Sequence, residues 1–590
     1  MRPGPSPLGR QIRPWIAVAI VALAAIVPYL GTLRHGFVWD DGILVESDHR
    51  IRSLGAALGA FREDFFGDAG HMGYYRPVVT LSFALDYRLG RSNPFGYHLT
   101  NVSLHALVAL LVLATLRQWG AAPRVACVGA VLFAVHPAHT ENVAWISGRT
   151  DILAAAFALA SVWLLGIHDA RASARASPES RWHRLARAAL LVGSAGCCAL
   201  ALLSKEIALA LPVVLVLDRW LRRPRDGRSS LAILPHLTIT VGYLLVRVLL
   251  VPPAMTRVPL DATLRSFLAS LPKYLGLFLV PAELTAYRRN PYSGWSDPLW
   301  ILGAIGAAGI AFAALRPRTR WRPAERLAVL GTLATFAPLS NLIRVSSPAD
   351  MGFTMADRFL YFPSIGLSAI AASLLVSATA SLSGRARTGC KLAIGASILG
   401  LAMTTLGRNR VWQNDVMLFE ATRATTDDAF LVDVNYAMAL RRDGDLARSI
   451  ALLEEKDAAT RPGSRNEQAV RLALAGAYAA NGETERARQM LLALRGRTRE
   501  PAPVLYDLGL LDESAGRGRD ALAWYRSAAE ADAKHIPTWV RVVRLADEVG
   551  ERDVACAALV RLRVLDPHRT DWAELDPGCP SASAARNASR

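Results

Sequence analysis

Two adjacent acids, Asp40 and Asp41, follow the first long apolar stretch of the chain, in GTLRHGFVWDDGILVESDHR (residues 31–50). A carboxylate within reach of an acceptor hydroxyl can remove its proton as a general base. Two solvated acids in a loop would give the same pattern. However, the loop over 34–97 is long and contains amphipathic aromatic stretches such as SLGAALGAFREDFFG. This favours a shaped loop that holds a carboxylate over a membrane cavity.

Further charged and polar side chains recur at or near the ends of other apolar runs. A fixed cation is a natural partner for a lipid phosphate, although cations near the interface also snorkel or pair with neighbouring acids. We expect at least one of them to bind the phosphate or sugar of a lipid-linked donor. The candidates are Arg76, His136, His139, Glu141, Arg149, Asp151, Lys205, Glu206, Asp357 and Arg358.

Metal and nucleotide chemistry have little support in the sequence. His136 and His139 have a spacing that suits a metal, but Pro137 interrupts a regular helix and no third ligand has motif spacing. Contacts to sugar or phosphate are therefore favoured for these histidines; no cofactor is indicated, and a divalent metal stays the open alternative. The six cysteines are scattered without a CxxC pair, which indicates neither a disulfide framework nor a zinc site. No Walker, GxGxxG, GxSxG or HExxH motif stands in a supporting context.

The elements that must position these residues are membrane helices. Of the 590 residues 52% are apolar, and the mean hydropathy is +0.25. The net charge of +18 comes almost entirely from arginine, which is typical of a GC-rich, bacterial genome. The arginines cluster in short loops between apolar runs, where the positive-inside rule puts them, so nucleic-acid binding is discounted.

Twelve apolar runs are candidates for membrane segments. They lie at 15–33, 98–116, 124–146, 151–167, 186–203, 206–220, 231–251, 265–285, 298–315, 327–343, 359–380 and 391–406. The first follows a basic start without an A-x-A cleavage site, so it is interpreted as an uncleaved anchor.

The four basic loops can all be cytoplasmic only if one run does not cross. The run at 265–285 contains Pro272, Lys273 and Pro281 and is predicted to be re-entrant or interfacial, with an ordinary kinked crossing helix as the alternative. Eleven spans then remain, with the N-terminus inside and the C-terminus outside. All the candidate site residues fall on the external face.

A different pattern begins after Leu406. Glycines recur at 444, 482, 516 and 550, and the surrounding residues fill in the tetratricopeptide pattern, as in LGLLDESAGRGRDALAWYRSA. The resemblance to tetratricopeptide repeats extends over about 430–568. Such an array offers a concave surface to an extended peptide, or it caps the membrane domain structurally.

The motifs taken together resemble one family. In order they are FVWDD, YYRPVVTLSFALDYRLGRSNPFGYHLTNVSLHAL, LFAVHPAHTENVAWISGRTDILAA, LLSKE, MADRFLYFPSIG and RNRVWQNDVMLFEAT, followed by the repeats. This set is similar to the transmembrane and tetratricopeptide-repeat O-mannosyltransferases and their bacterial relatives, over nearly the whole chain. One departure is Ala286 before Tyr287, where relatives often carry an acid.

The resemblance implies a C-type glycosyltransferase fold, a polyprenyl-phosphate sugar donor and inversion at the anomeric carbon. The general base would be Asp40 or Asp41, and an arginine or lysine would stabilise the leaving phosphate. The acceptor would be Ser or Thr hydroxyls of exported proteins, presented by the repeats. Neither the sugar, mannose or another hexose, nor the acceptor follows from the residues.

The expected architecture is all-α, with an enzyme in the membrane and a helical solenoid after it. The expected divisions are a multi-span membrane domain at 1–410, a junction at 411–429, tetratricopeptide repeats at 430–570 and a disordered tail at 571–590. The expected location is a bacterial inner membrane, with the site and repeats on the periplasmic face. Two competing functions are a non-catalytic membrane scaffold and a transferase that acts on cell-envelope glycan or lipid.

Overall fold

The computed structural model describes residues 13–67, 72–173, 180–222, 231–251, 259–288, 290–316, 321–340, 353, 355–426, 430–498, 500–565 and 571–579. The chain divides into two compact units. The membrane unit comprises Met1–Ser47 with Ile51–Leu418, and the repeat unit comprises Asp48–Arg50 with Phe419–Arg590. The division at Leu418 falls within the predicted junction at 411–429.

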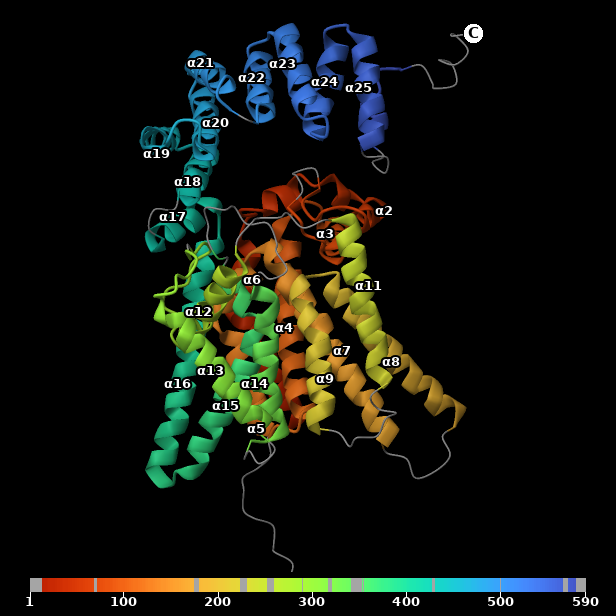
Figure 1. Ribbon diagram of the computed structural model, residues 1–590, viewed down its shortest axis with the longest axis vertical. Coiled ribbons are helices and arrows are strands. Elements are labelled where there is room, and N and C mark those ends of the chain that lie inside the picture. Colours follow the sequence, from red (N-terminus) through yellow and green to blue (C-terminus); the bar gives the residue numbers. More distant parts are fainter. Residues whose placement is uncertain are drawn as a thin grey trace, which may run out of the picture. The chain divides into compact units, whose positions relative to one another are not determined.

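The membrane unit is all-helical throughout its described ranges, apart from one isolated bridge between Arg288 and Met355 (Figure 1). This confirms the expected all-α membrane architecture. Its α-helices are α1 (Pro14–Ile26), α2 (Leu54–Ala57), α3 (Pro77–Gly90), α4 (Pro94–Gln118), α5 (Pro123–Val135), α6 (Thr140–Ala144), α7 (Arg149–Ser173), α8 (Arg181–Leu202), α9 (Leu211–Arg222), α11 (Leu234–Leu250), α12 (Leu260–Leu279), α13 (Pro298–Leu315), α14 (Pro323–Phe336), α15 (Pro363–Ser381) and α16 (Gly384–Asn409). The next helix, α17 (Asp415–Thr425), spans the division between the two units.

Short 3-10 or π turns join many of these helices. They are η1 (Val27–Arg34), η2 (Gly42–Glu46), η3 (His49–Arg52), η4 (Leu58–Phe61), η6 (Pro137–His139), η7 (Ile146–Gly148), η8 (Glu206–Ala210), η9 (Leu231–Ile233), η10 (Ala337–Ser340), η12 (Asp357–Leu360) and η13 (Arg410–Trp412).

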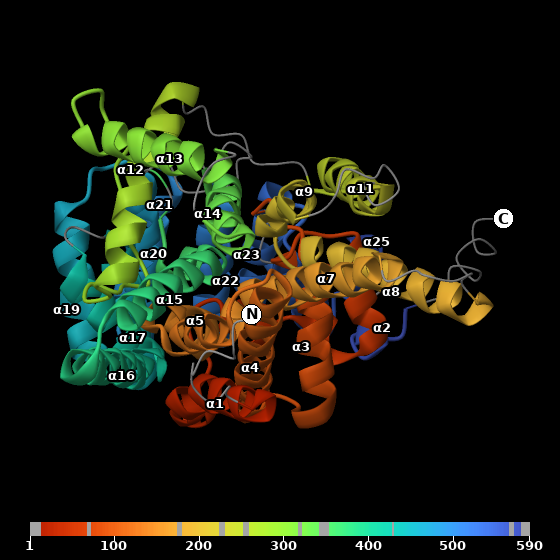
Figure 2. The same cartoon turned by 90° about the horizontal axis from the view of Figure 1, so that it is seen from below.

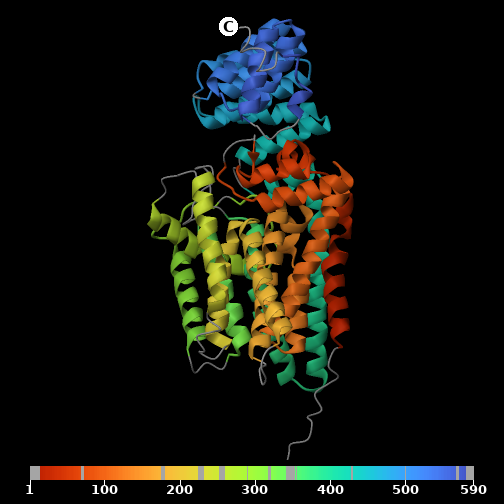
Figure 3. The ribbon, with the colours of Figure 1, turned by 90° about the vertical axis from the view of Figure 1, so that its right-hand side faces the viewer.

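Eight helices in the described ranges are long and apolar enough to cross a bilayer. They are Pro14–Arg34, Pro94–Gln118, Ile146–Ala172, Arg181–Leu202, Leu231–Leu250, Pro298–Leu315, Pro363–Ser381 and Gly384–Trp412. Each corresponds to one of the twelve predicted runs, and in Figure 3 the long helices of this unit run side by side. The chain is therefore a multi-pass membrane protein.

The other four predicted runs form different elements. Three of them become helices of 12 to 14 residues, namely α5, α9 and α14. The predicted re-entrant run at 265–285 becomes α12, a 20-residue helix with Pro272 inside it. The count of eleven crossings, and the non-crossing path of α12, therefore stay predictions.

The centre of the membrane unit is a tight packing of small side chains. Helix α4 packs against α1, α5 and α7, while α15 packs against α5 and α14, and α14 also contacts α9. Figure 2, which looks along the helices, shows α4 and α5 near the middle of this arrangement. Alanines such as Ala130, Ala134, Ala154 and Ala155 are fully buried there. Small residues let membrane helices approach closely, which builds a rigid frame.

The frame is interrupted where the chain passes from α5 to α7. Pro137 follows the end of α5, and the segment then turns through η6, α6 and η7. Gly148 permits this fold, because an added Cβ would lie 2.5 Å from the carbonyl oxygen of Glu141. The amide of Asn101 donates to the freed carbonyls of Trp145 and Ile146, at 3.0 and 3.3 Å. Irregular backbone inside a membrane protein needs such partners.

The repeat unit consists of paired antiparallel helices. The pairs are α18 (Phe430–Asp443) with α19 (Leu446–Ala459), α20 (Arg465–Ala480) with α21 (Thr484–Arg495), α22 (Ala502–Ser514) with α23 (Gly518–Ala531), and α24 (Ile536–Glu548) with α25 (Arg552–Leu565). The periodic glycines 444, 482, 516 and 550 stand at the turn within each pair, with φ between 75° and 92°. Only glycine adopts this conformation without strain, which explains the period seen in the sequence.

The end of the repeat unit differs from expectation. Cys556 on α25 forms a disulfide with Cys579, and Trp572 is 3% exposed within the core of the last repeat. The expectation that the cysteines form no disulfide is therefore wrong, and so is the expectation of disorder for residues 571–579. Residues 580–590 lie outside the described ranges. The sequence misled because a 23-residue separation has no motif of its own.

Candidate active site

The two adjacent acids have different surroundings. Asp41 is fully buried, and its carboxylate accepts hydrogen bonds from the backbone N–H of Ser147 at 2.9 Å, the Ser147 hydroxyl, and the backbone N–H of Val38 at 3.1 Å. Burial raises the pKa of Asp41 to about 7, opposed by these hydrogen bonds. Because Asp41 is saturated by internal donors, it fixes the loop to the turn at η7.

The side chain of Asp40 is only partly buried, and its carboxylate does not share the hydrogen bonds of Asp41. Among the described residues no hydrogen-bond partner of its carboxylate is found. Burial raises the pKa of Asp40 to about 6, and the nearby positive charges of Arg358 and Arg76 oppose this rise. Its carboxylate therefore keeps its accepting capacity and has a pKa close to neutral pH, as a general base requires.

The residue before this pair has an unusual backbone. Trp39 has φ 55°, in the left-handed region that bulky side chains avoid. Holding a residue there costs on the order of 1–3 kcal/mol, and such strain persists only where the surroundings fix it. The strained residue and Asp40 are adjacent, so the direction of the carboxylate depends on what holds Trp39.

Three ion pairs lie around Asp40. Arg76 binds the carboxylate of Glu206, with Nη2 to Oε2 at 3.0 Å. Arg358 pairs with Glu141, which also accepts the backbone N–H of Arg358 at 2.9 Å. In the third pair Nζ of Lys205 lies 2.6 Å from Oδ2 of Asp151. These pairs come from five separate segments of the chain.

The three cations interact with one another electrostatically. Burial lowers the pKa of Lys205 to about 8; Asp151 opposes this, whereas the positive charges of Arg76 and Arg358 lower it further. The paired acid Glu141 raises the pKa of Arg358 despite its burial. Arg76, Lys205 and Arg358 thus form one group of interacting positive charges, and two of them, Arg76 and Arg358, also act on Asp40.

The arginines keep donors that their acids do not use. Within the described ranges, Nη1 of Arg76 makes no hydrogen bond, and neither do Nε and Nη2 of Arg358. Both side chains are also partly accessible, at 12% and 22%. An incoming anion could therefore be bound without breaking the existing pairs.

Arg149 is not part of this group. It is fully buried, and its guanidinium binds Asp86 at 2.5 Å, the side chain of Asn101 at 2.6 Å and the carbonyl of Tyr97 at 2.8 Å. Every guanidinium nitrogen is occupied, since Nη1 also donates to Ser82 at 3.3 Å. Arg149 joins α7 to α3 and α4 and offers nothing to a ligand.

The two predicted histidines lie in the packed interior. His136 stacks on Phe278 with ring centres 4.7 Å apart, and its Nε2 lies 2.9 Å from the Phe278 carbonyl. His139 Nε2 lies 2.8 Å from the hydroxyl of Ser364. No group of three possible metal ligands occurs in the part of the chain that the structure describes. These contacts are those of structural histidines.

Asp357 is adjacent in sequence to Arg358 but has its own partners. It accepts the backbone N–H of Thr285 at 2.6 Å and lies 3.3 Å from Arg288. Burial raises its pKa to about 7, and the nearby charge of Glu141 adds to this rise. Asp357 therefore ties the segment after α12 to η12, at the edge of the site.

Several residues around the site were missed by the sequence analysis. Tyr74 interacts electrostatically with Asp40, Arg76 and Arg358, and Arg76 lies 4.3 Å from the centre of its ring. Arg408 faces Asp357 and Glu141 from the end of α16, without an ion pair to any described residue. Arg408 has a signal in the sequence, because it precedes the VWQND stretch that was used for the family resemblance.

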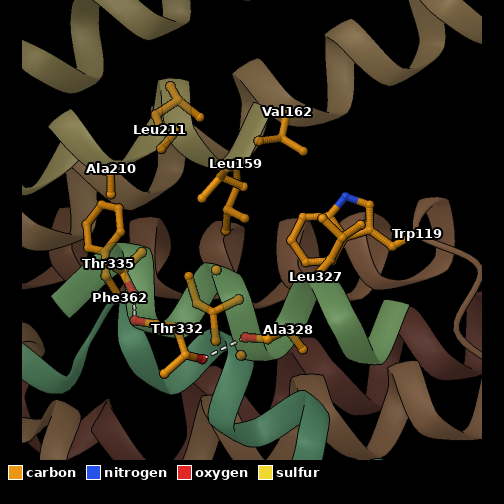
Figure 4. Close-up of a pocket in the computed structure, with 15 residues that line it drawn as sticks. Trp119, Leu159, Val162, Ala210, Leu211, Leu327, Ala328, Thr332, Thr335 and Phe362 are labelled. Atoms are coloured by element: carbon orange, nitrogen blue, oxygen red, sulfur yellow. Dashed lines mark hydrogen bonds between the residues drawn. The ribbon is translucent and has the colours of Figure 1, made fainter. Parts of the chain in front are cut away.

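An apolar cavity of about 60 Å³ lies between α7, α9, α14 and α15 (Figure 4). Leu159, Val162, Leu211 and Leu327 line it, as Figure 4 shows. Two segments connect it to the site. Helix η8 begins with Glu206 and ends at Ala210 on the cavity wall, and Phe362 on the wall follows η12, which carries Arg358.

No family model matches this chain. It is 26% identical over 423 residues to the protein O-mannosyl-transferase F38B6.6 of Caenorhabditis elegans, covering 68% of this chain and 56% of that protein. It is 25% identical over 486 residues to protein O-mannosyl-transferase TMTC3 of Mus musculus, covering 73% of this chain and 50% of that protein. It is 40% identical over 132 residues to protein O-mannosyl-transferase Tmtc1 of Drosophila melanogaster, covering 22% of this chain and 15% of that protein.

These relatives confirm the family resemblance seen in the motifs. The chain spans about half the length of the two relatives that it matches over most of its own length. Two solved membrane proteins show weak likeness. One is ArnT from Cupriavidus metallidurans bound to undecaprenyl phosphate, with 18% identity and a TM-score of 0.37, covering 81% of this chain and 79% of that one. The other is the Archaeoglobus fulgidus oligosaccharyltransferase tethered with an acceptor peptide, with 13% identity and a TM-score of 0.38, covering 74% of this chain and 59% of that one.

Proposed function

We propose that this protein transfers a sugar, mannose or another hexose, from a polyprenyl phosphate to Ser or Thr hydroxyls of exported proteins, with inversion and with Asp40 as the general base. The observation that carries the proposal is that the Asp40 carboxylate has no hydrogen-bond partner in the described part of the chain, while the charges of Arg76 and Arg358 act on it. The relatives named protein O-mannosyl-transferases support the reaction class.

The chemistry is a single displacement at the anomeric carbon. The acceptor oxygen forms a bond to this carbon while the bond to the donor phosphate oxygen breaks, and Asp40 takes the hydroxyl proton. The base contributes ~10² to 10⁴-fold to the rate. Because the acceptor attacks from the side opposite the leaving group, the anomeric configuration is inverted.

The group of positive charges stabilises the leaving lipid phosphate. Arg76 and Arg358 have N–H donors that no described residue uses, and Lys205 adds a positive charge nearby. Donors already aimed at the developing charge need no reorganisation during the reaction, and removing one such donor typically costs ~10² to 10³-fold in rate. Asp41 contributes by holding the loop rather than by accepting the proton.

The apolar cavity supports a lipid-linked donor. It is lined almost entirely by aliphatic and aromatic side chains, and η8 and η12 connect it with the residues that would bind the phosphate. At about 60 Å³ the cavity is too small for a whole polyprenyl chain, so it would contact only the part of the chain nearest the phosphate. The charged residues would then contact the donor phosphate, and the apolar side chains would contact the isoprenoid chain.

The repeats are proposed to present acceptor proteins on the external, periplasmic face. The Cys556–Cys579 disulfide favours an oxidising compartment for this unit, because disulfides are rare in the cytosol. The four free cysteines all belong to the membrane unit. The same reaction on cell-envelope glycan or lipid is the second outcome that an experiment must separate.

The direct test reconstitutes the full chain in nanodiscs with radiolabelled polyprenyl-phosphate mannose. Acceptors are offered in parallel as exported-protein extract and as envelope glycolipid, and the product linkage is determined by NMR. We expect label on Ser or Thr of protein with inverted configuration. Label only on glycolipid would assign the alternative acceptor, and no transfer from any polyprenyl-phosphate hexose would overturn the proposal in favour of a scaffold.

A further inference from the structure

The segment Arg410–Asp415, which we call the junction segment, contacts the loop that carries Asp40. The carbonyl oxygen of Gln413 accepts the backbone N–H of Gly36 at 3.1 Å. The carboxylate of Asp415 accepts the backbone N–H of Trp39 at 2.7 Å. These contacts join parts of the membrane unit that are 376 residues apart in sequence.

A stack of three tryptophan rings reinforces this contact. Trp39 stacks on Trp145 with ring centres 5.2 Å apart and planes inclined by 20°. Trp145 in turn stacks on Trp412, at 5.9 Å and 24°. Trp412 is fully buried, and Arg358 lies 5.7 Å from the Trp145 ring centre. The stack therefore runs from the junction segment to the residue that precedes Asp40.

Trp39 needs such support because of its left-handed backbone. At φ 55° it would relax to an extended or helical conformation if its partners were removed. That relaxation would rotate the peptide leading into Asp40. Asp41 holds the far side of the same turn through Ser147, so the loop is fixed from both sides of Asp40.

We infer that Asp415 and Trp412 are positioning residues for the transfer reaction: they hold Trp39 in its left-handed conformation and so aim the Asp40 carboxylate at the acceptor hydroxyl. The inference rests on the proposed function, since it assigns Asp40 as the base. Neither Asp415 nor Trp412 touches substrate in this scheme. They act on the reaction through the backbone and ring of Trp39.

The test compares Asp415→Ala with Asp415→Asn in the full chain in nanodiscs. Asparagine keeps an oxygen that can accept the Trp39 N–H, whereas alanine removes it. We expect Asp415→Ala to lower kcat by about 10- to 100-fold with the KM for polyprenyl-phosphate sugar changed by less than about threefold. Asp415→Asn should recover most of the rate. Asp553→Ala, which removes an exposed acid from the first turn of α25, is the matched control.

A second measurement does not depend on activity. Hydrogen–deuterium exchange of the peptide covering residues 36–41 should be faster in Asp415→Ala and in Trp412→Ala than in the unchanged chain. Trp412→Phe, which keeps an aromatic ring in the stack, should lie closer to the unchanged chain.

The outcomes separate the inference from the function on which it rests. Exchange and kcat unchanged in Asp415→Ala would overturn the positioning role, as would equal losses in the alanine and asparagine variants. If instead Asp40→Asn transfers sugar normally while Asp415→Ala accelerates exchange, the support of the loop stands and Asp40 as base fails.

Discussion

Two clusters of charged residues in the membrane unit, one around Arg149 and one around Asp40, contain the same residue types but differ in how far their hydrogen-bonding capacity is used. Around Arg149, every guanidinium nitrogen has a partner, and the side chain is fully buried. Around Asp40, the carboxylate has no described hydrogen-bond partner, and Arg76 and Arg358 each keep unused donors. The two clusters are joined by the short stretch from Ser147 to Asp151.

The difference separates charges whose hydrogen-bonding capacity the fold has used from charges that keep capacity for a ligand. A saturated buried arginine is required by the fold, because its removal would leave its acid buried without a counter-charge. An unsaturated cluster keeps capacity for a ligand at some cost to stability. Burial follows the same division, since the saturated residues Asp41 and Arg149 are both at 0% exposure and Asp40 is only partly covered.

The largest expected effect comes from removing the unpartnered carboxylate. Asp40→Asn should lower the rate of sugar transfer by ~10² to 10⁴-fold, because asparagine cannot accept the acceptor proton. Transfer is measured with labelled polyprenyl-phosphate sugar, and the unfolding temperature serves as the control for folding. Transfer within a factor of two of the unchanged chain would remove Asp40 from the mechanism and erase the contrast between the clusters.

Breaking the saturated cluster should act on stability. Arg149→Ala leaves Asp86 buried without its partner, and the loss of a buried partner typically costs ~3–5 kcal/mol. Denaturant unfolding in detergent measures it, and Arg519→Ala on the exposed face of α23 is the control. If the Arg149→Ala variant has normal stability but binds the donor poorly, Arg149 is a donor-binding residue and its structural role is contradicted.

An unsaturated cation should show the reverse. Arg76→Gln should lower kcat by ~10²-fold, since a donor to the leaving phosphate is lost, while the unfolding free energy falls less than in Arg149→Ala. The comparison of kcat with stability in the two variants sharpens the distinction directly. Equal stability losses without a specific kcat effect would make Arg76 another structural arginine.

The smallest expected effect is that of pH. Asp40, with a pKa of about 6, is protonated below that value and cannot act as base, so the rate should fall ~5-fold from pH 6 to pH 5 and then approach a ~10-fold fall for each further pH unit. Lys205, with a pKa of about 8, loses its charge above that value, which gives an alkaline limb.

The substitution Lys205→Arg should move the alkaline limb to higher pH, because arginine stays charged. The control is the acid limb, which should not move in this variant. An acid limb that persists in the residual activity of Asp40→Asn would assign the titration to another group.

Much of the architecture was predictable because it depends on local patterns. Eight of the twelve apolar runs became helices that can cross a bilayer, and the glycine period marked the turns of the helix pairs. The helices α5, α9 and α14 are shorter than the apolar runs that predicted them. Prolines such as Pro137 and Pro338 stop two of them, an effect that hydropathy averaged over a window does not register.

The site was predictable only in part. The sequence pointed to the FVWDD stretch and to cations near helix ends, and these do meet around Asp40. It could not separate Arg149 from Arg76, because each is simply an arginine beside an apolar run. The disulfide of Cys579 was missed because partner choice depends on the fold of the last repeat.

The sequence by itself determined that this is a helical membrane chain with a periodic repeat, since hydropathy and glycine spacing act over short distances along the backbone. Only the tertiary structure decided which of two neighbouring acids is held and which is open. Asp41 meets Ser147, 106 residues away, and Trp39 meets Asp415, 376 residues away. The physical reason is that hydrogen-bond saturation depends on what packs around a side chain, and distant segments supply those partners.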